Sequence, residues 1–350
     1  MNRLTDIEKP REHKGEASEL FLTYVRTKQL FKARLRRCAS DGFVHIPTKL
    51  IESDFFVYPD YNRKTELRRL IDAGKLEFTQ EEINGRKTYM YRCLVPGPID
   101  ITLIKAPDES HYKPIHFEMR DTLKGVSLPT GAPSTDYFDT FLEHKETMIS
   151  RFFTVDSFAG RVHTPVTNFH RTHRPNILLD GSGTVSFDVA TMQPQILGFI
   201  LEKKAGQNLF SDALNAGKDI YEAITLKAGL NTRDEGKKRF FEIIFAPANN
   251  DMVKMFGDAH WIRWINEFKK TPLPQNPKGH LKQYSNVAWA LQTMEVKIMA
   301  EVWEALHRDR IRFLSVHDEI IVKETDRHPA EGIFRRVLDK HFKYYKLNTK

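Results

Sequence analysis

The sequence predicts an α+β protein in which a small helix-and-hairpin domain precedes a larger mixed unit. Two helical stretches lead into two extended runs joined at Asn84-Gly85, the strongest short-range signal for a β-hairpin. Pro96-Gly97-Pro98 follows and predicts a domain boundary. Beyond it, β-prone runs end at the acidic residues Asp188 and Asp318, and a capped helix lies between them in the chain. Helices and strands therefore share the second unit.

The composition divides the chain into three consecutive parts. Residues 1–14 are charged and poor in apolar side chains, which predicts a flexible tail. Residues 15–97 form the small domain and residues 98–350 the larger unit, without internal repeats or low-complexity tracts. The clearest interior loop is the Pro-rich segment 272–280, which we expect to be a flexible surface connection.

The small domain has the element order of a winged helix. Apolar residues recur at helical spacing over about residues 16–37, and a second helix is predicted at 64–73, ended by Gly74 in the left-handed conformation. The hairpin follows. This winged-helix-like or thumb-like domain either contacts nucleic acid or is a structural domain with solvated cations, and no base-contact signature decides between the two. Its basic residues are Arg63, Lys64, Arg68 and Arg69.

Length and charge narrow the class of protein. The chain has 350 residues, of which 40% are hydrophobic, so it can bury a substantial core. A formal net charge of +8 favours an anionic partner. Nucleic acid is the commonest such partner, and a solvated basic surface is the alternative that charge alone leaves open.

The cysteine content and the hydropathy of the chain indicate the cellular compartment in which we expect the protein. The two cysteines, Cys38 and Cys93, cannot build a disulfide framework or a metal-ligand set, which favours a reducing compartment. No apolar run is long enough to span a bilayer, and the charged N-terminus does not resemble a secretory signal. We therefore expect a cytoplasmic protein without a membrane partner.

The first candidate site residue is Asp188. Residues 184–187 are β-prone and end at this acid, and Pro194 can occupy the first turn of a helix that continues to Leu201. A carboxylate at the end of a buried strand is rigidly held and open to ligands. A lone aspartate in this position is more often a helix cap, so its neighbours decide its role.

The second candidate is a helix with cations and aromatic rings on one face. Thr232 and Glu235 form a capping box, so a helix begins here. Positions four apart drift by only ~40° around a helix and form one stripe, and Pro247 ends the helix. The stripe consists of Arg233, Lys237, Phe241 and Phe245. A helix start with an Arg and a Lys suits a triphosphate, whereas the alternative is an amphipathic helix with both phenylalanines in the core.

The third candidate is an acidic turn. Apolar runs flank His317, Asp318 and Glu319, which predicts two strands joined by a tight turn. Acidic groups in such a turn are commonly solvated. They form a site for Mg²⁺ when a second carboxylate comes near, because this ion prefers oxygen ligands and takes one or two carboxylates with phosphate oxygens.

The order of these segments resembles motifs A, B and C of the family A (Pol I-like) DNA polymerases. Motif B of that family has the spacing Arg-x₃-Lys-x₃-Phe/Tyr-x₃-Tyr, and motif C is commonly Val-His-Asp-Glu, which residues 316–319 match letter for letter. Residues 159–164 resemble the Thr-Gly-Arg segment upstream of motif A, and residues 219–221 resemble the Asp-Ile-His/Tyr segment before motif B. The resemblance covers roughly residues 150–325 and is that of a compact phage or mobile-element enzyme.

The resemblance implies a right-hand fold whose palm carries an antiparallel sheet, with fingers above it. It also implies two Mg²⁺ ions, for which Mn²⁺ can substitute, held by Asp188 and Asp318, with a DNA template–primer and dNTPs as partners. Lys237 is the further catalytic residue. The implied binding residues are Arg233 and Lys237 for the triphosphate, Phe241 for the sugar, Phe245 for the templating position, Arg161 and Gln292 for the duplex, and His317 and Glu319 for the primer end.

Two positions depart from the family pattern. Gln193 stands five residues after Asp188, where the family carries a Glu that excludes the ribose 2′-hydroxyl, and Phe245 replaces a Tyr. These departures leave the choice between dNTPs and NTPs open. The segment from Asp188 to Asp318 is compact, which predicts reduced fingers. About 150 residues precede the core, too few for an exonuclease domain together with a full thumb, so we expect no proofreading.

Two other functions compete with a DNA polymerase. A single-subunit RNA polymerase or primase shares the fold, although its motif C generally reads His-Asp-Ser. A non-catalytic DNA-binding replication protein with a degenerate polymerase core is the alternative from another class. It is supported by the winged-helix-like domain and by the departures at Gln193 and Phe245.

Overall fold

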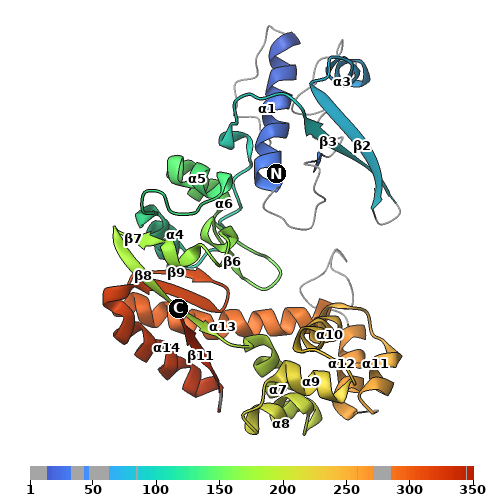
Figure 1. Ribbon diagram of the computed structural model, residues 1–350, viewed down its shortest axis with the longest axis vertical. Coiled ribbons are helices and arrows are strands. Elements are labelled where there is room, and N and C mark those ends of the chain that lie inside the picture. Colours follow the sequence, from blue (N-terminus) through green and yellow to red (C-terminus); the bar gives the residue numbers. More distant parts are fainter. Residues whose placement is uncertain are drawn as a thin grey trace. The chain divides into compact units, whose positions relative to one another are not determined.

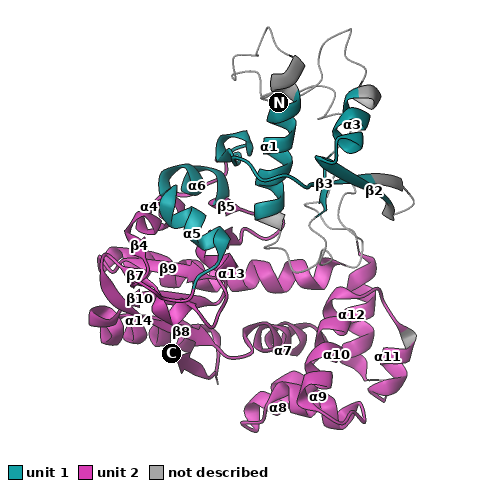
Figure 2. Ribbon diagram, turned by 45° about the horizontal axis from the view of Figure 1, so that its top comes forward, with its two compact units in different colours: residues 1–108, 134–152 teal, residues 109–133, 153–350 magenta. Residues whose placement is uncertain are grey.

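The computed structural model describes residues 14–32, 43–46, 63–83, 86–257, 259–271, 285–343 and 345–350. The chain divides into two compact units (Figures 1 and 2). The first comprises residues 1–108 and 134–152, and the second comprises residues 109–133 and 153–350.

The first unit contains the predicted helices and hairpin. Its elements are α1 (Lys14–Lys32), β1 (Val44–His45), α3 (Arg63–Asp72), β2 (Leu76–Ile83) and β3 (Arg86–Cys93). The three strands form an antiparallel sheet in the order β1-β3-β2. Gly74 follows α3 with φ +66°, the left-handed conformation expected there. The hairpin is confirmed by its pairing, while Asn84 and Gly85 at its tip lie outside the described residues.

The first unit extends further along the chain than the predicted small domain. A 3₁₀ turn, η2 (Ile101–Leu103), follows the hairpin, and helices α5 (Asp136–Glu143) and α6 (Lys145–Phe152) belong to the same unit. Helix α5 contacts α1 and α6 contacts η2, which explains why these segments cluster with the first unit rather than with the chain after residue 98. The predicted tail and the 272–280 loop lie outside the described residues.

The second unit is built on an antiparallel sheet. Its strands run in the order β4-β7-β8-β10-β9, and β11 pairs with β8. They are β4 (Val126–Ser127), β7 (Leu178–Leu179), β8 (Ser182–Val189), β9 (Phe313–Val316), β10 (Glu319–Lys323) and β11 (Leu347–Thr349). The expected strand ending near Asp188 and the two strands around the acidic turn are confirmed. A separate two-stranded ladder joins β5 (Thr154–Val155) to β6 (Val162–His163).

Three helices pack around this sheet. They are α4 (Pro114–Thr122), α13 (Asn286–Arg308) and α14 (Arg327–His341). Helix α4 contacts β9, α14 contacts β10, and α13 contacts both helices (Figure 1). Val185 and Phe187 of β8 and Ile320 of β10 are almost completely buried, because alternate and central strand positions face these helices.

A cluster of helices is inserted between β8 and α13. It comprises α7 (Met192–Ala205), α8 (Leu209–Asn215), α9 (Ile220–Lys227), α10 (Arg233–Phe245), α11 (Asn250–Met255) and α12 (His260–Lys270). Its core includes Phe210, which contacts the rings of Phe240 and Trp261 edge-on. The long helix α13 reaches from the sheet to this cluster and contacts α7, α10 and α12 (Figure 1).

The fold class is therefore α+β, as predicted, with antiparallel strands and a helical insertion. Helix α7 begins at Met192, two residues before Pro194, and α10 begins at Arg233 behind the expected capping box of Thr232 and Glu235. Within the part of the chain that the structure describes, none of the helices combines the length and apolar composition needed to cross a membrane.

Candidate active site

Strand register brings the two predicted acidic segments together. Strand β8 pairs antiparallel with β10 so that Asp188 lies opposite Glu319. Strand β10 returns to β9 through a two-residue turn, His317-Asp318, with Val316 paired to Glu319. Residues 130 positions apart in the sequence thus meet at one end of two adjacent strands.

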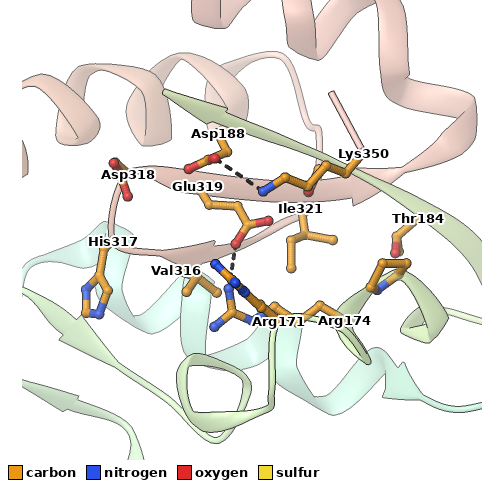
Figure 3. Close-up of a pocket in the computed structure, with 12 residues that line it drawn as sticks. Arg171, Arg174, Thr184, Asp188, Val316, His317, Asp318, Glu319, Ile321 and Lys350 are labelled. Atoms are coloured by element: carbon orange, nitrogen blue, oxygen red, sulfur yellow. Dashed lines mark hydrogen bonds and ion pairs between the residues drawn. The ribbon is translucent and has the colours of Figure 1, made fainter. Parts of the chain in front are cut away.

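The acids line a pocket of about 240 Å³ (Figure 3). Its walls combine carboxylates with cations: Arg171, Arg174, Pro175, Thr184, Ser186, Asp188, Val316, His317, Asp318, Glu319, Ile321 and Lys350. Both signs of charge in one concave site suit a ligand that is itself anionic and arrives with a metal ion.

The turn that presents Asp318 is strained. His317 has φ +59°, a left-handed conformation that a non-glycine residue adopts rarely and at a cost. The surrounding ladder fixes this conformation, because Val316 and Glu319 on either side are both held in strand pairing. Asp318 therefore lines the pocket from the turn between the two strands and not from within the ladder.

Asp318 is in an environment that disfavours its charge. Burial raises the pKa of this carboxyl group to about 8, and the negative charges of Glu295 and Asp188 act in the same direction. Carboxylates that raise the pKa of a neighbouring carboxyl group lie close to it. A divalent ion bound at Asp318 would offset this negative charge.

Asp188 is held by the neighbouring strand β11. Its Oδ2 atom accepts hydrogen bonds from Lys350 Nζ at 3.2 Å and from Asn348 Nδ2 at 3.4 Å. Asn348 is paired directly with Asp188 in the β8–β11 ladder. Figure 3 shows the Lys350 ammonium pointing at the Asp188 carboxylate.

Behind the two acids, Glu295 of α13 forms a buried ion pair. Its side chain is only 2% exposed, and both of its carboxylate oxygens accept from one guanidinium nitrogen of Arg161, at 2.6 and 2.7 Å. Gln193 Nε2 donates to Glu295 Oε2 at 3.1 Å. Burial raises the pKa of Glu295, while Arg161 and Gln193 act against this rise. The cluster joins the start of α7, the segment before β6 and the middle of α13.

Glu319 has a different partner. Its Oε2 atom accepts from Arg174 at 2.7 Å, and Arg174 also donates to the backbone oxygens of Phe169 and Thr167. Glu319 is 7% exposed, so its charge is compensated within the protein. Arg171 lines the same pocket, and no hydrogen bond or ion pair of the described residues involves its side chain.

Two histidines lie beside the turn. Burial is the main cause that lowers the pKa of His317 to about 3, so its ring is neutral at physiological pH. The nearby Arg161, His163 and Arg174 act in the same direction. The rings of His317 and His163 meet edge-on with centroids 5.6 Å apart. His163 in turn lies 3.1 Å from the carboxylate of Asp156, whose other oxygen accepts from the backbone N–H groups of Ala159 and Gly160.

Helix α10 presents its stripe to solvent. Arg233, Lys237, Phe241 and Phe245 are all exposed. Phe241 and Phe245 are 39% and 41% exposed and stack on each other at 5.8 Å. The buried face of the helix consists of Gly236, Phe240, Ile243 and Ile244. The alternative that places both phenylalanines in the core is therefore wrong.

The start of α10 is anchored to α9. Arg233 donates two hydrogen bonds to Asp219 Oδ2, at 2.8 and 3.1 Å, and its guanidinium lies 5.0 Å from the Tyr221 ring centroid. Burial raises the pKa of Tyr221 to about 12, and the charges of Asp219 and Asp318 contribute to the rise against Arg233. The negative charge of Asp318 thus acts on α9, the helix that anchors Arg233 through Asp219 and Tyr221.

The structure brings six of the predicted residues together at or near the pocket and leaves the others apart from it. Asp188, His317, Asp318 and Glu319 share the pocket, and Gln193 and Arg161 meet at Glu295 behind it. The α10 stripe does not line this pocket. Gln292 lies one helical turn before Glu295 on α13 and is half-buried.

Three residues of the site were missed from the sequence: Glu295, Arg174 and Lys350. Glu295 left a signal, since it lies on the apolar helical stripe of Leu291, Ile298 and Val302, where a carboxylate must be buried and paired. The sequence near Arg174 and Lys350 contains no pattern that indicates their roles, because their partners Glu319 and Asp188 lie in distant segments.

The donor set fits a divalent metal in part. Among the described residues, no group of three or more His, Cys, Asp or Glu side chains is arranged to hold an ion. Asp188 and Asp318 could supply two carboxylates, the number that Mg²⁺ commonly takes when phosphate oxygens and water complete its shell. The raised pKa of Asp318 and the ammonium on Asp188 both indicate that this pair favours a nearby cation.

The comparisons with known proteins find similarity among solved structures. No model of a protein family matches the chain, and no curated protein matches it. Among solved structures, the POL domain of Pol1 from M. smegmatis in complex with DNA primer-template and dNTP is similar, with a TM-score of 0.45 and 15% identity. The match covers 70% of this chain and 57% of that chain, so this chain spans less than two thirds of the matched protein.

Proposed function

We propose that this protein is a template-directed DNA polymerase that adds deoxynucleotides to a primer 3′-hydroxyl with Mg²⁺ as cofactor. The observation that carries the proposal is the β8–β10 register, which brings Asp188 and the acidic turn at Asp318 into one pocket. The sequence gives no local reason for these two segments to meet. Their meeting is what a shared metal site requires.

The reaction is a nucleotidyl transfer. The primer 3′-oxygen attacks the α-phosphorus of a nucleoside triphosphate, a new P–O bond forms, and the bond to the leaving pyrophosphate breaks. Bound Mg²⁺ would favour the ionised 3′-oxygen and neutralise charge on the pyrophosphate. Asp188 and Asp318 would hold the ions, and metal binding would keep the Asp318 carboxyl ionised at neutral pH despite its burial.

Helix α10 would bind the incoming nucleotide. Arg233 and Lys237 lie in its first two turns, where side-chain charge and the positive end of the helix both favour phosphate oxygens. Phe241 and Phe245 extend the same stripe with exposed rings that can pack on a sugar and a base. Two stacked and exposed rings offer such a ligand an apolar surface, which supports this role.

The buried cluster behind the pocket would set geometry rather than contact phosphate. Arg161 and Gln193 both donate to the carboxylate of Glu295, so each has a partner within the protein. Contact of Arg161 and Gln292 with a duplex, and of His317 and Glu319 with a primer end, are parts of the proposal. The position of Gln193 also makes the choice of sugar a question for experiment.

Primer extension on a defined template tests the proposal. The protein is given Mg²⁺ with dNTPs or with NTPs, and we expect incorporation of dNTPs that Asp188→Asn and Asp318→Asn abolish while DNA binding persists. Asp309→Asn is the matched control, because this aspartate is exposed and lies outside the pocket. Equal or better use of NTPs would favour an RNA polymerase or primase, and absence of any incorporation would favour a non-catalytic replication protein.

A further inference from the structure

Lys350 lies next to the carboxylate of Asp188, one of the two proposed metal ligands. Its ammonium lies 3.2 Å from Asp188 Oδ2, and the Asn348 amide lies 3.4 Å from the same oxygen. Within the described residues, Lys350 is the cation that forms an ion pair with Asp188. One oxygen of a proposed metal ligand is thus already engaged by a positive charge of this chain.

The backbone fixes this arrangement. The N–H of Lys350 donates to the Ser186 oxygen and the Ser186 N–H donates to the Lys350 oxygen, both at 3.0 Å. These reciprocal bonds extend the β8–β11 ladder by one pair beyond Thr349. Alternate residues of a strand face the same side, so Asn348 and Lys350 both lie on the side of Asp188. The lysine is therefore positioned by the sheet and not by its side chain alone.

We propose that Lys350 is an internal cation that competes with the divalent metal for Asp188 and so sets the metal concentration at which the site fills. The inference rests on the proposed function, since it takes Asp188 as a metal ligand. When metal binds, the ammonium leaves Oδ2 and remains in the pocket beside Arg171, where anionic phosphate oxygens can accept its hydrogen bonds.

The size of the competition follows from the exposure of the pair. Asp188 is 26% exposed and Lys350 is 52% exposed, so the ion pair is partly screened by water. Removing the Lys350 charge should therefore lower the dissociation constant for the metal by only a small factor. Added salt screens the pair and should reduce this factor further. The effect is measurable as a metal affinity and does not require catalysis.

The experiment measures Mn²⁺ binding to the full chain by the loss of the free-ion signal in electron paramagnetic resonance. We expect Lys350→Gln to bind roughly two- to fivefold tighter than the wild type at low salt, and this gain to shrink at about 0.5 M salt. Lys350→Met is a second neutral variant, and Lys350→Arg should stay near the wild type. Lys346→Gln is the matched control, because it removes the same charge from an exposed position of the same segment.

The outcomes separate the two proposals. If Asp188→Asn removes Mn²⁺ binding but both neutral variants of Lys350 match Lys346→Gln, or bind more weakly, the competition is refuted and the metal site stands. If the wild type shows no binding that depends on Asp188, the metal site fails and the competition fails with it. Tighter binding in the neutral Lys350 variants that disappears with Asp188→Asn supports the competition.

Discussion

The acidic pocket and the α10 stripe are built on opposite principles, although both belong to the second unit. The pocket gathers carboxylates in partly buried positions, and burial together with the charges of Glu295 and Asp188 raises the pKa of Asp318. The stripe places cations and aromatic rings in solvent, with only Arg233 anchored by a neighbouring helix. The sheet therefore concentrates unfavourable charge, whereas the helix exposes groups whose partners are outside the protein.

The difference follows from the two kinds of backbone. Strand register in a sheet places side chains from distant segments within a few ångströms of one another. The paired strands also hold a strained residue such as His317 in the turn between them. A helix fixes the spacing of side chains within one segment only. The four residues of the stripe therefore share one face of α10 without any contribution from a distant segment. Substitutions of the pocket acids should therefore impair function more than folding. Substitutions of the buried residues that support the pocket or the stripe should lower the free energy of unfolding.

The largest effect is expected for the two pocket acids. Asp318→Asn or Asp188→Asn should reduce the nucleotide incorporation rate by about a thousandfold or more, because a metal ion contributes several kcal/mol to the transition state. The protein should remain folded, because the ion pair that Asp188→Asn weakens, with Lys350, is partly exposed and contributes about 1 kcal/mol or less. Single-turnover primer extension measures the rate, with Asp309→Asn as control.

The pH dependence of stability gives an independent check on Asp318. The unfolded chain releases this proton near pH 4, whereas the folded protein retains it up to about pH 8, because burial and neighbouring charges raise the pKa. Stability of the metal-free protein is therefore lost as pH rises through this window. Asp318→Asn should remove that loss, so its advantage in denaturant unfolding should grow from pH 4 to pH 8. A constant difference would show that the carboxyl is not buried as described.

The second largest effect is expected at Glu295, which lies beneath the pocket. Glu295→Ala leaves Arg161 buried without its partner, and breaking a buried ion pair in this way costs about 3–5 kcal/mol. Denaturant unfolding measures the loss. Glu301→Ala on the same helix is the control, because Glu301 is 37% exposed and its partners His341 and Lys340 are 24% and 61% exposed. A loss at Glu295 no greater than that at Glu301 would mean that the pair is solvated.

Sequence predicted some of these features and could not predict others. The period of the stripe and the capping box of Thr232 and Glu235 were sufficient for α10, because both depend on residues within one segment. Apolar runs on each side of the acidic turn predicted β9 and β10 for the same reason. The fractional exposure of Phe241 was open from the sequence, since helical spacing alone does not say which face is covered.

The contacts between segments were beyond local reasoning. Asp188 and Glu319 are paired although they lie 131 positions apart in the sequence, and nothing near either residue specifies the partner. Strand β11 is short and polar, so its pairing with β8 had no pattern that could predict it. Glu295 could have been found, because a carboxylate on an apolar helical stripe predicts a buried partner.

A third, intermediate effect is expected where α10 packs on α9. A Cβ atom at Gly236 would lie 2.2 Å from the backbone oxygen of Tyr221 and from the Thr225 hydroxyl, so the two helices must separate. Gly236→Ala should therefore cost about 1–3 kcal/mol and weaken nucleotide binding, because Arg233 loses its anchor. The control is Gly332→Ala in α14, where no atom lies within 4 Å and added helix propensity should stabilise.

The smallest stability effect is expected on the exposed stripe itself. Phe241→Ala should change the free energy of unfolding by about 1 kcal/mol or less, because the ring is 39% exposed and loses mainly its stacking on Phe245. Its neighbour Phe240 is fully buried, so Phe240→Ala should cost about 3–5 kcal/mol. If the two substitutions destabilise equally, the stripe is a packing surface. If Phe241→Ala leaves stability intact but raises the KM for nucleotide, the ring is kept in solvent for a ligand, and the contrast between the helix and the sheet holds.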